Sequence, residues 1–95
     1  MALFVLACID KPNSLDLRIV TRGAHFAYAR GLGAMVRLGG PFLDEKGEMA
    51  GSLIIIEAAD MAAAEAFSLN DPYRKAGLFE SVEIRPWRVT FGELP

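Results

Sequence analysis

Two short segments that are apolar at every position limit what this chain can fold into. They are residues 3–9 and residues 53–56, and both are rich in branched side chains. Apolar runs of this length are typical of strands that are buried on both faces of a sheet. Residues 34–38 and 81–89 predict two further strands, and the last of these alternates apolar with polar side chains.

The segment after the first strand has the spacing of a helix. Ser14 is a candidate N-cap, and the helix is expected to run to about Arg30. Its apolar side is formed by five residues: Leu17, Val20, Ala24, Ala27 and Tyr28. Arg18, Arg22 and His25 lie on a neighbouring side, where their spacing stacks them along one stripe.

The segment after the third strand predicts a second helix. Asp60 is a candidate N-cap for a helix over residues 61–69, and Asn70 is expected to end this helix in the left-handed conformation. Asp71 then caps a short extra turn that has Pro72 at its first position.

The predicted order of elements is strand, helix, strand, strand, helix, strand. This is the order of the split βαβ, or ferredoxin-like, α+β fold, in which a four-stranded antiparallel sheet carries two helices on one face. The first and third strands are central in that fold, and the second and fourth are edges. Pro86 agrees with an edge position, because proline cannot donate a ladder hydrogen bond. Residues 1–95 are therefore expected to form a single domain of this class.

The predicted central strands leave apolar side chains on the face of the sheet that two helices cannot cover. Exposure of each large side chain forgoes roughly 1.5–3 kcal/mol, and an apolar patch of that size is unusual on a monomer. We therefore expect a homodimer with its sheets packed face to face. The alternative is that the loop over residues 42–50 folds over the sheet, although that loop is short and polar.

The charge balance excludes some classes of function. The chain has 10 Lys and Arg against 12 Asp and Glu, a net charge of −2, and its basic residues are scattered. This argues against nucleic-acid binding by a basic face and against a polybasic membrane anchor. No stretch approaches the ~20 apolar residues of a membrane span, and no signal peptide is visible, so a cytoplasmic location is expected. The single cysteine, Cys8, is expected to be a small core residue.

His25 is the only histidine and the first candidate for proton transfer, because imidazole titrates near neutral pH. Arg18 and Arg22 on the same stripe are candidates to bind an anionic group of a substrate. Taken alone, the two arginines are more typical of a solvated face that pairs with Asp residues. A single His on a helix is likewise more often a surface or core residue than a catalyst.

Two other segments are candidates to meet this stripe in space. Asp71 is first of all an N-cap, which commits one carboxylate oxygen to backbone N–H groups. The other oxygen is free to accept from an imidazole N–H and to fix its tautomer. Gly39-Gly40-Pro41 is either a plain turn or a segment whose backbone approaches a ligand and stabilises negative charge. One His and one Cys make no recognisable metal-ligand set, and no cofactor motif is present.

An ordered set of short motifs resembles the YciI-like (YCII-related) family over nearly the whole chain. The set is Asp10, Ser14-Leu15-Asp16-Leu17-Arg18, Arg22-Gly23-Ala24-His25, Gly39-Gly40-Pro41, Gly51-Ser52, Asn70-Asp71-Pro72-Tyr73 and Ala76-Gly77-Leu78. The resemblance implies a dimeric α/β-barrel with a ferredoxin-like fold. It also implies a pocket in which His25 and Asp71 form the active pair, with Arg22 and Gly40-Pro41 as binding residues.

One relative in this superfamily is a dehydrochlorinase of a chlorinated hydroxyquinol, and muconolactone isomerases share the fold. The leading hypothesis is therefore a small lyase or isomerase without a cofactor, in which His25 moves a proton and Asp71 orients the imidazole. Arg22, together with Arg18, holds an anionic group, and backbone near Gly40 stabilises negative charge. Two alternatives stay open: a non-catalytic small-molecule-binding or regulatory homodimer, and a haem protein with His25 as axial ligand.

Overall fold

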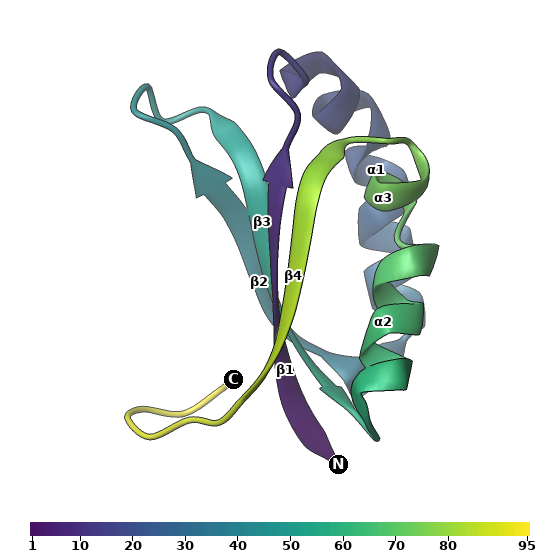
Figure 1. The fold of residues 1–95 in the computed structure, drawn as a ribbon, viewed down its shortest axis with the longest axis vertical. Helices are drawn as coiled ribbons and strands as arrows, with labels where there is room; N and C mark the ends of the chain where they lie inside the picture. The colour runs from purple at the N-terminus through teal and green to yellow at the C-terminus, as the bar shows by residue number, and fades with distance from the viewer.

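Four strands and three α-helices follow one another in the computed structural model, which describes residues 1–95 (Figure 1). The strands are β1 (Ala2–Asp10), β2 (Val36–Leu43), β3 (Met49–Ala58) and β4 (Phe79–Trp87). The helices are α1 (Leu15–Gly31), α2 (Met61–Asn70) and the short α3 (Pro72–Lys75), with a 3₁₀ turn at Gly33–Met35. The order is the predicted one, and the extra turn after the second helix is α3.

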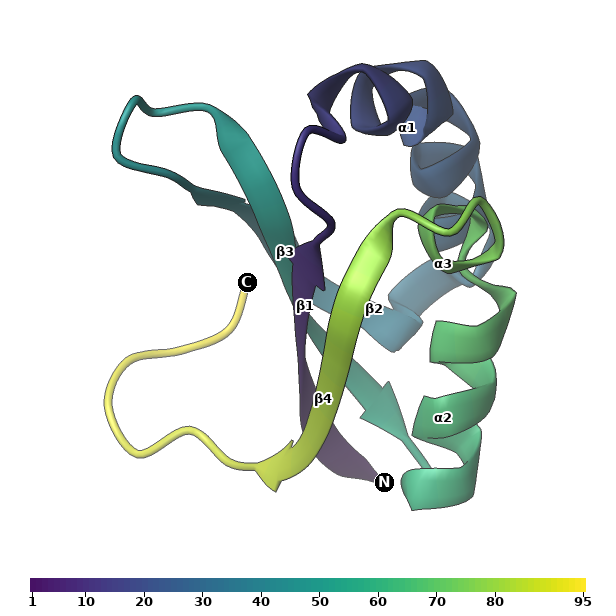
Figure 2. The same ribbon diagram turned by 45° about the horizontal axis from the view of Figure 1, so that its top comes forward.

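The four strands form one antiparallel sheet in the order β2-β3-β1-β4. The first and third strands are central, as predicted, and Pro86 lies on the edge strand β4. All three helices cover the same face of this sheet, as Figures 1 and 2 show. The ferredoxin-like α+β fold is therefore confirmed.

The core lies between the covered face of the sheet and the helices. β1 contributes Phe4, Leu6 and Cys8, which alternate along the strand and are at most 4% exposed. The other members come from β3 and α2: Ile54, Ile56, Ala58, Ala64 and Phe67. Cys8 is a small core residue, as expected. Burial raises the pKa of its thiol to about 12, so the thiol stays protonated at neutral pH.

The other face of the sheet has no helix over it. Alternate side chains of the strands point to this face, and Ile9, Leu53 and Trp87 are 44%, 37% and 42% exposed. The alternative cover, the loop over residues 42–50, does not lie over this face. β2 and β3 run through most of that segment and leave residues 44–48 as a hairpin turn. The exposed apolar face from which we predict a homodimer is therefore present in the structure.

β2 is longer than predicted. The strand does not stop before Gly39-Gly40-Pro41 but runs through it to Leu43, and Pro41 pairs with Ser52 of β3. Proline is tolerated here because β2 is an edge strand with a hydrogen-bonded neighbour on one side only. The interpretation of Gly39-Gly40-Pro41 as a plain turn is therefore wrong, and these residues belong to the sheet.

α1 does not bury its predicted apolar side. Of the five residues assigned to that side, only Tyr28 packs against the core, where its hydroxyl donates to the carbonyl of Phe67 (2.8 Å). The other four are exposed, Val20 by 82%. The stripe that contains Arg18 and His25 turns toward the sheet instead, and Arg18 is the buried residue of this helix. The prediction is wrong because polar contacts orient the helix, and hydrophobic periodicity does not register them.

The helix termini agree only partly with the sequence-based expectations. Asp60 and Asp71 cap α2 and α3 as predicted, with carboxylates that accept backbone N–H hydrogen bonds of 2.8 and 2.9 Å. Ser14 is the N-cap residue of α1, as predicted, but its side chain makes no capping hydrogen bond, because its hydroxyl donates to the carbonyl of Pro12 (3.3 Å). Asn70 is not left-handed but is the last helical residue of α2, which continues into the cap of α3.

Replacement of two glycines of the fold by alanine should change the free energy of unfolding in opposite directions. A methyl on Gly51 of β3 would overlap the carbonyl oxygen of Cys8, a backbone atom of β1, whereas Gly23 of α1 has open space around it. We expect Gly51→Ala to lower the free energy of unfolding by about 1–3 kcal/mol. Gly23→Ala should raise it by about 0.5–1 kcal/mol. Urea unfolding measures both changes, and equal stability of the two variants would contradict this packing.

Candidate functional site

A pocket of about 330 Å³ lies between α1 and the β2–β3 side of the sheet. Its size is at the lower end of the range for small-molecule sites. Five of the six predicted site residues line it: Arg18, Arg22, His25, Gly40 and Pro41. The sixth, Asp71, is 2% exposed and lies behind the imidazole of His25. The stripe of α1 and the glycine-rich part of β2 thus face one cavity.

His25 and Asp71 are in direct contact although they are 46 positions apart in the chain. His25 Nδ1 lies 2.9 Å from Asp71 Oδ1. Asp71 is held in place as the N-cap of α3, and the same Oδ1 accepts the backbone N–H of Tyr73 at 2.9 Å. One oxygen therefore serves both the cap and the imidazole, whereas the sequence predicted a separate oxygen for each.

The contact with Asp71 determines which ring nitrogen of His25 is protonated. A carboxylate accepts hydrogen bonds, so Nδ1 carries a proton and donates it to Asp71. In the neutral ring Nε2 then holds the lone pair, and the side chain of His25, which is 13% exposed, lines the pocket. This arrangement suits a general base whose protonated form is stabilised by a neighbouring negative charge.

Tyr73 packs against the imidazole. Its ring stacks on that of His25, with 4.2 Å between the centroids and an interplanar angle of 18°. Tyr73 is 2% exposed, and burial raises the pKa of its hydroxyl, so the phenol is neutral near pH 7. Sequence reasoning placed Tyr73 in a motif without a role. The available signal was its position in the helical turn that Asp71 caps.

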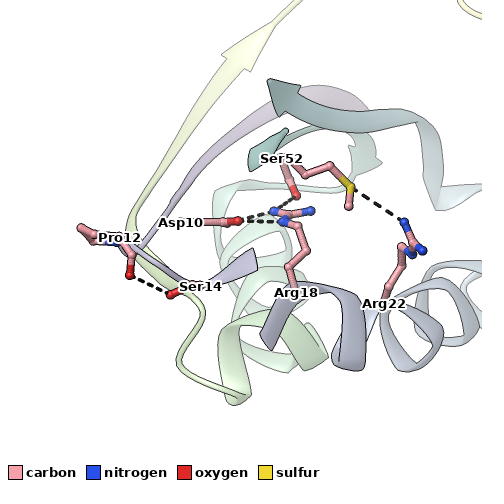
Figure 3. Close-up of polar contacts among 7 residues, drawn as sticks. Asp10, Pro12, Ser14, Arg18, Arg22 and Ser52 are labelled. Atoms are coloured by element: carbon pink, nitrogen blue, oxygen red, sulfur yellow. Dashed lines mark hydrogen bonds and ion pairs between the residues drawn. The ribbon is translucent and has the colours of Figure 1, made fainter. Parts of the chain in front are cut away.

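Arg18 is buried beside the pocket and is tied to β1 and β3 (Figure 3). Its Nε and Nη2 donate to the two carboxylate oxygens of Asp10 at 2.7 and 2.9 Å, and Nη2 also donates to Ser52 Oγ at 2.9 Å. Burial opposes the charge of the guanidinium, but the hydrogen bond and charge of Asp10 outweigh it and raise the pKa of Arg18. The interpretation of Arg18 as part of a solvated face is therefore wrong, although it does pair with an aspartate.

Arg22 is the other cation of the pocket and has no carboxylate partner. Its polar contact with the protein is a long one, from Nη1 to Met49 Sδ at 3.9 Å. No Asp or Glu lines the pocket, and Asp10 balances the charge of Arg18, so Arg22 supplies the uncompensated positive charge of the pocket. Arg22 keeps most of its hydrogen-bonding capacity for a ligand.

The β2 side of the pocket offers space because it carries few side-chain atoms. Gly39 and Pro41 pair with β3 residues whose side chains face α1, so they lie on the pocket side of the sheet. Gly40 pairs with Leu53, whose side chain lies on the opposite face of the sheet. Because glycine has no side chain, Gly40 lines the pocket with its backbone. Gly39 therefore belongs to the candidate site together with the two predicted residues.

Asp10 and Ser52 are site residues to which sequence reasoning assigned no role. Both appear in the motifs that carry the family resemblance, yet neither has an obvious chemical partner in the sequence. The pattern of the strands could have predicted that these two residues lie close together. Asp10 follows the apolar run of β1 and Ser52 precedes that of β3, and antiparallel pairing brings these two strand ends together.

No group of three or more His, Cys, Asp or Glu side chains in the structure could hold a metal ion. The Nε2 atom of His25 is the imidazole nitrogen that an added ligand in the pocket would meet. None of the helices has the length and apolar character that a membrane crossing requires.

Comparison with known proteins places the chain among small relatives of similar length. The model of the YCII-related domain matches residues 2–88. Protein YciI of Escherichia coli O6:H1 is 34% identical over 97 residues, which cover 94% of this chain and 99% of that protein. An uncharacterized protein of Haemophilus influenzae is 29% identical over 96 residues, covering 93% and 98%.

The fold is also similar to a solved structure that holds a ligand. This is 5-chloro-2-hydroxyhydroquinone dehydrochlorinase (TftG) from Burkholderia phenoliruptrix AC1100, in complex with 2,5-dihydroxybenzoquinone. The TM-score is 0.83 and the identity 37%, over 90% of this chain and 93% of that one. The domain match covers almost all of the sheet and helices described above and agrees with the ordered motifs. This chain therefore belongs to the YCII-related, YciI-like domain family.

Proposed function

We propose that this protein is a small lyase or isomerase that moves a proton on a small oxygenated ring compound with its own side chains. The observation that carries the proposal is the 2.9 Å contact of His25 Nδ1 with Asp71 Oδ1, in a histidine that lines a pocket. A base positioned in this way contributes about 10²–10⁴-fold to a proton transfer. Mere binding of a ligand would not require a fixed imidazole tautomer.

In the proposed reaction, Nε2 of His25 takes a proton from a hydroxyl group of the ring, or from a carbon next to a carbonyl. The Asp71 carboxylate stabilises the imidazolium, which returns the proton at another position to complete an isomerisation. In an elimination, the imidazolium returns the proton to the ring carbon that bears chlorine, which gives a ketone tautomer with a tetrahedral C–Cl carbon. His25 then removes a second hydroxyl proton, a second carbonyl forms, and chloride departs with the electrons of its bond. The net loss is one proton and one chloride, so the reaction consumes no oxidant or reductant.

The likeness to TftG supports this class of substrate, because that protein is named as a dehydrochlorinase of a chlorinated hydroxyhydroquinone. The pocket of this chain suits a compound of that kind. Phe26 supplies an apolar surface for a ring, and Arg22, with Arg18, supplies donors for an anionic oxygen. The backbone at Gly40 and Pro41 lets the ring approach closely. Pro41 has no N–H group, so the proposed stabilisation of negative charge falls to backbone N–H near Gly40.

Incubation with 5-chloro-2-hydroxyhydroquinone in the absence of oxygen tests the proposal. We expect the protein to release one chloride ion for each substrate molecule consumed, at a rate well above that of heat-denatured protein. A chloride-selective electrode and the absorbance of the quinone product measure the two quantities independently. Binding of this compound without chloride release or isomerisation would contradict the proposal and favour a non-catalytic role.

We also propose that two copies of the chain pack through their open sheet faces. The support is the partly exposed apolar surface of that face, to which Ile9, Leu53 and Trp87 belong. Sedimentation equilibrium is expected to give about twice the 10.3 kDa of one chain. Leu53→Lys should shift the equilibrium to monomer, and Val20→Lys, on the outer side of α1, should not. A wild-type monomer at high concentration would contradict this assembly.

A further inference from the structure

The C-terminal segment, residues 88–95, follows β4 and carries an aromatic side chain that contacts almost nothing in its own chain. Phe91 is 96% exposed, more than any other large apolar side chain of the protein. All of this segment except its first residue lies beyond residues 2–88, which the YCII-related domain matches. A single exposed apolar residue is ordinary on a protein surface, so the place of Phe91 in the fold is what matters.

The C-terminal segment lies on the open side of the sheet. In Figures 1 and 2 it swings away from the helices, toward the face that they leave uncovered. Gly92 has a φ of 79°, which glycine adopts without strain, and it turns the chain directly after Phe91. Leu94 beyond this turn is half-buried, whereas Phe91 is not. Phe91 therefore stands at the bend of a loop, on the side of the sheet where we place the second copy.

A groove of about 280 Å³ on the same face of the sheet has room for an aromatic ring. Its walls are four apolar side chains of β2 and β3: Leu38, Phe42, Leu53 and Ile55. Between them lies Gly39-Gly40-Pro41, where a Cβ added to Gly40 would meet no atom within 4 Å. The same three residues line the pocket of His25 on the other face. One strand, β2, therefore separates the groove from the pocket.

Phe91 does not reach the groove of its own chain. β4 and β2 are the two edges of the sheet, three strand spacings or about 14 Å apart. Phe91 is the fourth residue after Trp87, the end of β4, and four residues extend about 13 Å at most. The groove lies farther still, because it is also displaced along the strands from the level of Trp87.

The groove of a second copy is within reach. Sheets that pack face to face are about 10 Å apart, which is less than the span of the four residues. A two-fold axis parallel to the strands reverses the strand order of the second copy, so β4 of one copy lies opposite β2 of the other. The C-terminal segment then leaves β4 next to the partner's groove.

We propose that the C-terminal segment of each copy crosses to the other copy, where Phe91 fills the groove between β2 and β3. This inference rests on the proposed pairing of the open sheet faces and names the contact that anchors it. A two-fold pair makes the contact twice, and an aromatic side chain buried in a pocket contributes much of the binding energy of an interface. Each copy thereby supports the β2 wall of the other copy's pocket.

Cross-linking between two single variants tests where Phe91 lies. Phe91→Cys and Leu38→Cys are refolded together and treated with a short bis-maleimide. Cys8 is buried, so it does not react. Each chain has one added thiol, and a product that joins the two sites must therefore join two copies. In such a pair the second groove still holds an unchanged Phe91, so one anchor persists.

We expect a covalent dimer in which mass spectrometry identifies the peptides of residues 91 and 38. Val20→Cys in place of Leu38→Cys is the matched control, since Val20 is 82% exposed on the outer side of α1. That mixture should give no joined product. The double variant Phe91→Cys/Leu38→Cys should likewise join two chains and not two sites of one monomer.

Sedimentation equilibrium tests how much Phe91 contributes. We expect Phe91→Ala to raise the dissociation constant of the dimer at least about 100-fold, because both anchors are lost. Thr90→Ala, an exposed neighbour in the same loop, should change it by less than about threefold. At a concentration where the wild type is dimeric, the amides of Gly39 and Gly40 should exchange hydrogen faster in Phe91→Ala than in Thr90→Ala.

A dimer that gives no product between Phe91→Cys and Leu38→Cys overturns the inference and favours another two-fold axis. A link within one monomer overturns it in favour of the chain's own tail. Equal dissociation constants, or equal exchange at Gly39 and Gly40, in Phe91→Ala and Thr90→Ala overturn it as well. A dimer that Leu53→Lys dissociates and Phe91→Ala does not would retain the proposed sheet pairing. None of these measurements needs turnover, so the proposed reaction stands or fails separately.

Discussion

Replacement of His25 by alanine is expected to lower the rate of chloride release by about 100- to 10,000-fold and to leave the protein folded. That range is the contribution of a positioned general base. The fold should persist because Asp71 keeps the backbone hydrogen bond of its cap and Arg18 still ties α1 to the sheet. The turnover number from a chloride electrode and the circular dichroism spectrum check the two parts of this expectation.

Asp71→Asn separates the charge of the pair from its geometry. The asparagine oxygen can still accept the backbone N–H of Tyr73 and the Nδ1–H of His25, so the cap and the tautomer persist. We expect the turnover number to fall at least about tenfold, because the imidazolium loses its counter-charge. Asp60→Asn is the matched control, since Asp60 caps α2 in the same way and contacts no histidine; its turnover number should equal that of the wild type.

Three outcomes would contradict this assignment. Wild-type turnover in His25→Ala would exclude proton transfer by this residue. Equal losses in Asp71→Asn and Asp60→Asn would show that the carboxylate matters for capping and not for its charge. Loss of activity that accompanies unfolding in His25→Ala would make the histidine a structural residue.

The topology could be predicted because it depends on the hydrophobic pattern of the strands. Two runs without a polar residue belong at the centre of a sheet, and an alternating strand that contains Pro86 belongs at an edge. The contact of His25 with Asp71 could only be a hypothesis, because spacing along the chain does not show whether residues 46 positions apart lie close in space. Each residue could be singled out by itself, His25 as the lone histidine of its stripe and Asp71 as the residue before Pro72.

The orientation of α1 could not be predicted in the same way. The periodicity rule assumes that the apolar side of a helix is buried, but in α1 Arg18 is buried and Val20 is exposed. A guanidinium tolerates burial when a carboxylate and a hydroxyl accept its protons. Here those acceptors, Asp10 and Ser52, come from two different strands. The stripe of α1 therefore marks both the site and the buried side of the helix.

Asp10→Ala is expected to lower the free energy of unfolding by about 3–5 kcal/mol. The substitution leaves the guanidinium of Arg18 buried with Ser52 as its remaining hydrogen-bond partner. Removal of one partner of a buried ion pair is unfavourable because the other charge stays buried without a counter-charge and with little solvation. Since small domains are stable by only about 5–15 kcal/mol, the midpoint of urea unfolding should fall markedly.

Two comparison variants show whether the unpaired charge causes that loss. Asp10→Leu/Arg18→Met removes both charges and is expected to recover most of the stability, because apolar replacement of a buried pair is often neutral. Glu57→Ala breaks the half-exposed pair with Arg37, whose N–O distance is 3.4 Å, and should change stability by no more than about 1 kcal/mol. If Asp10→Ala were as mild as Glu57→Ala, water would have to reach Arg18 as freely as it reaches Arg37. The guanidinium would then not be held in one position, and a directed hydrogen bond from Arg18 to an anionic ligand would lose its structural basis.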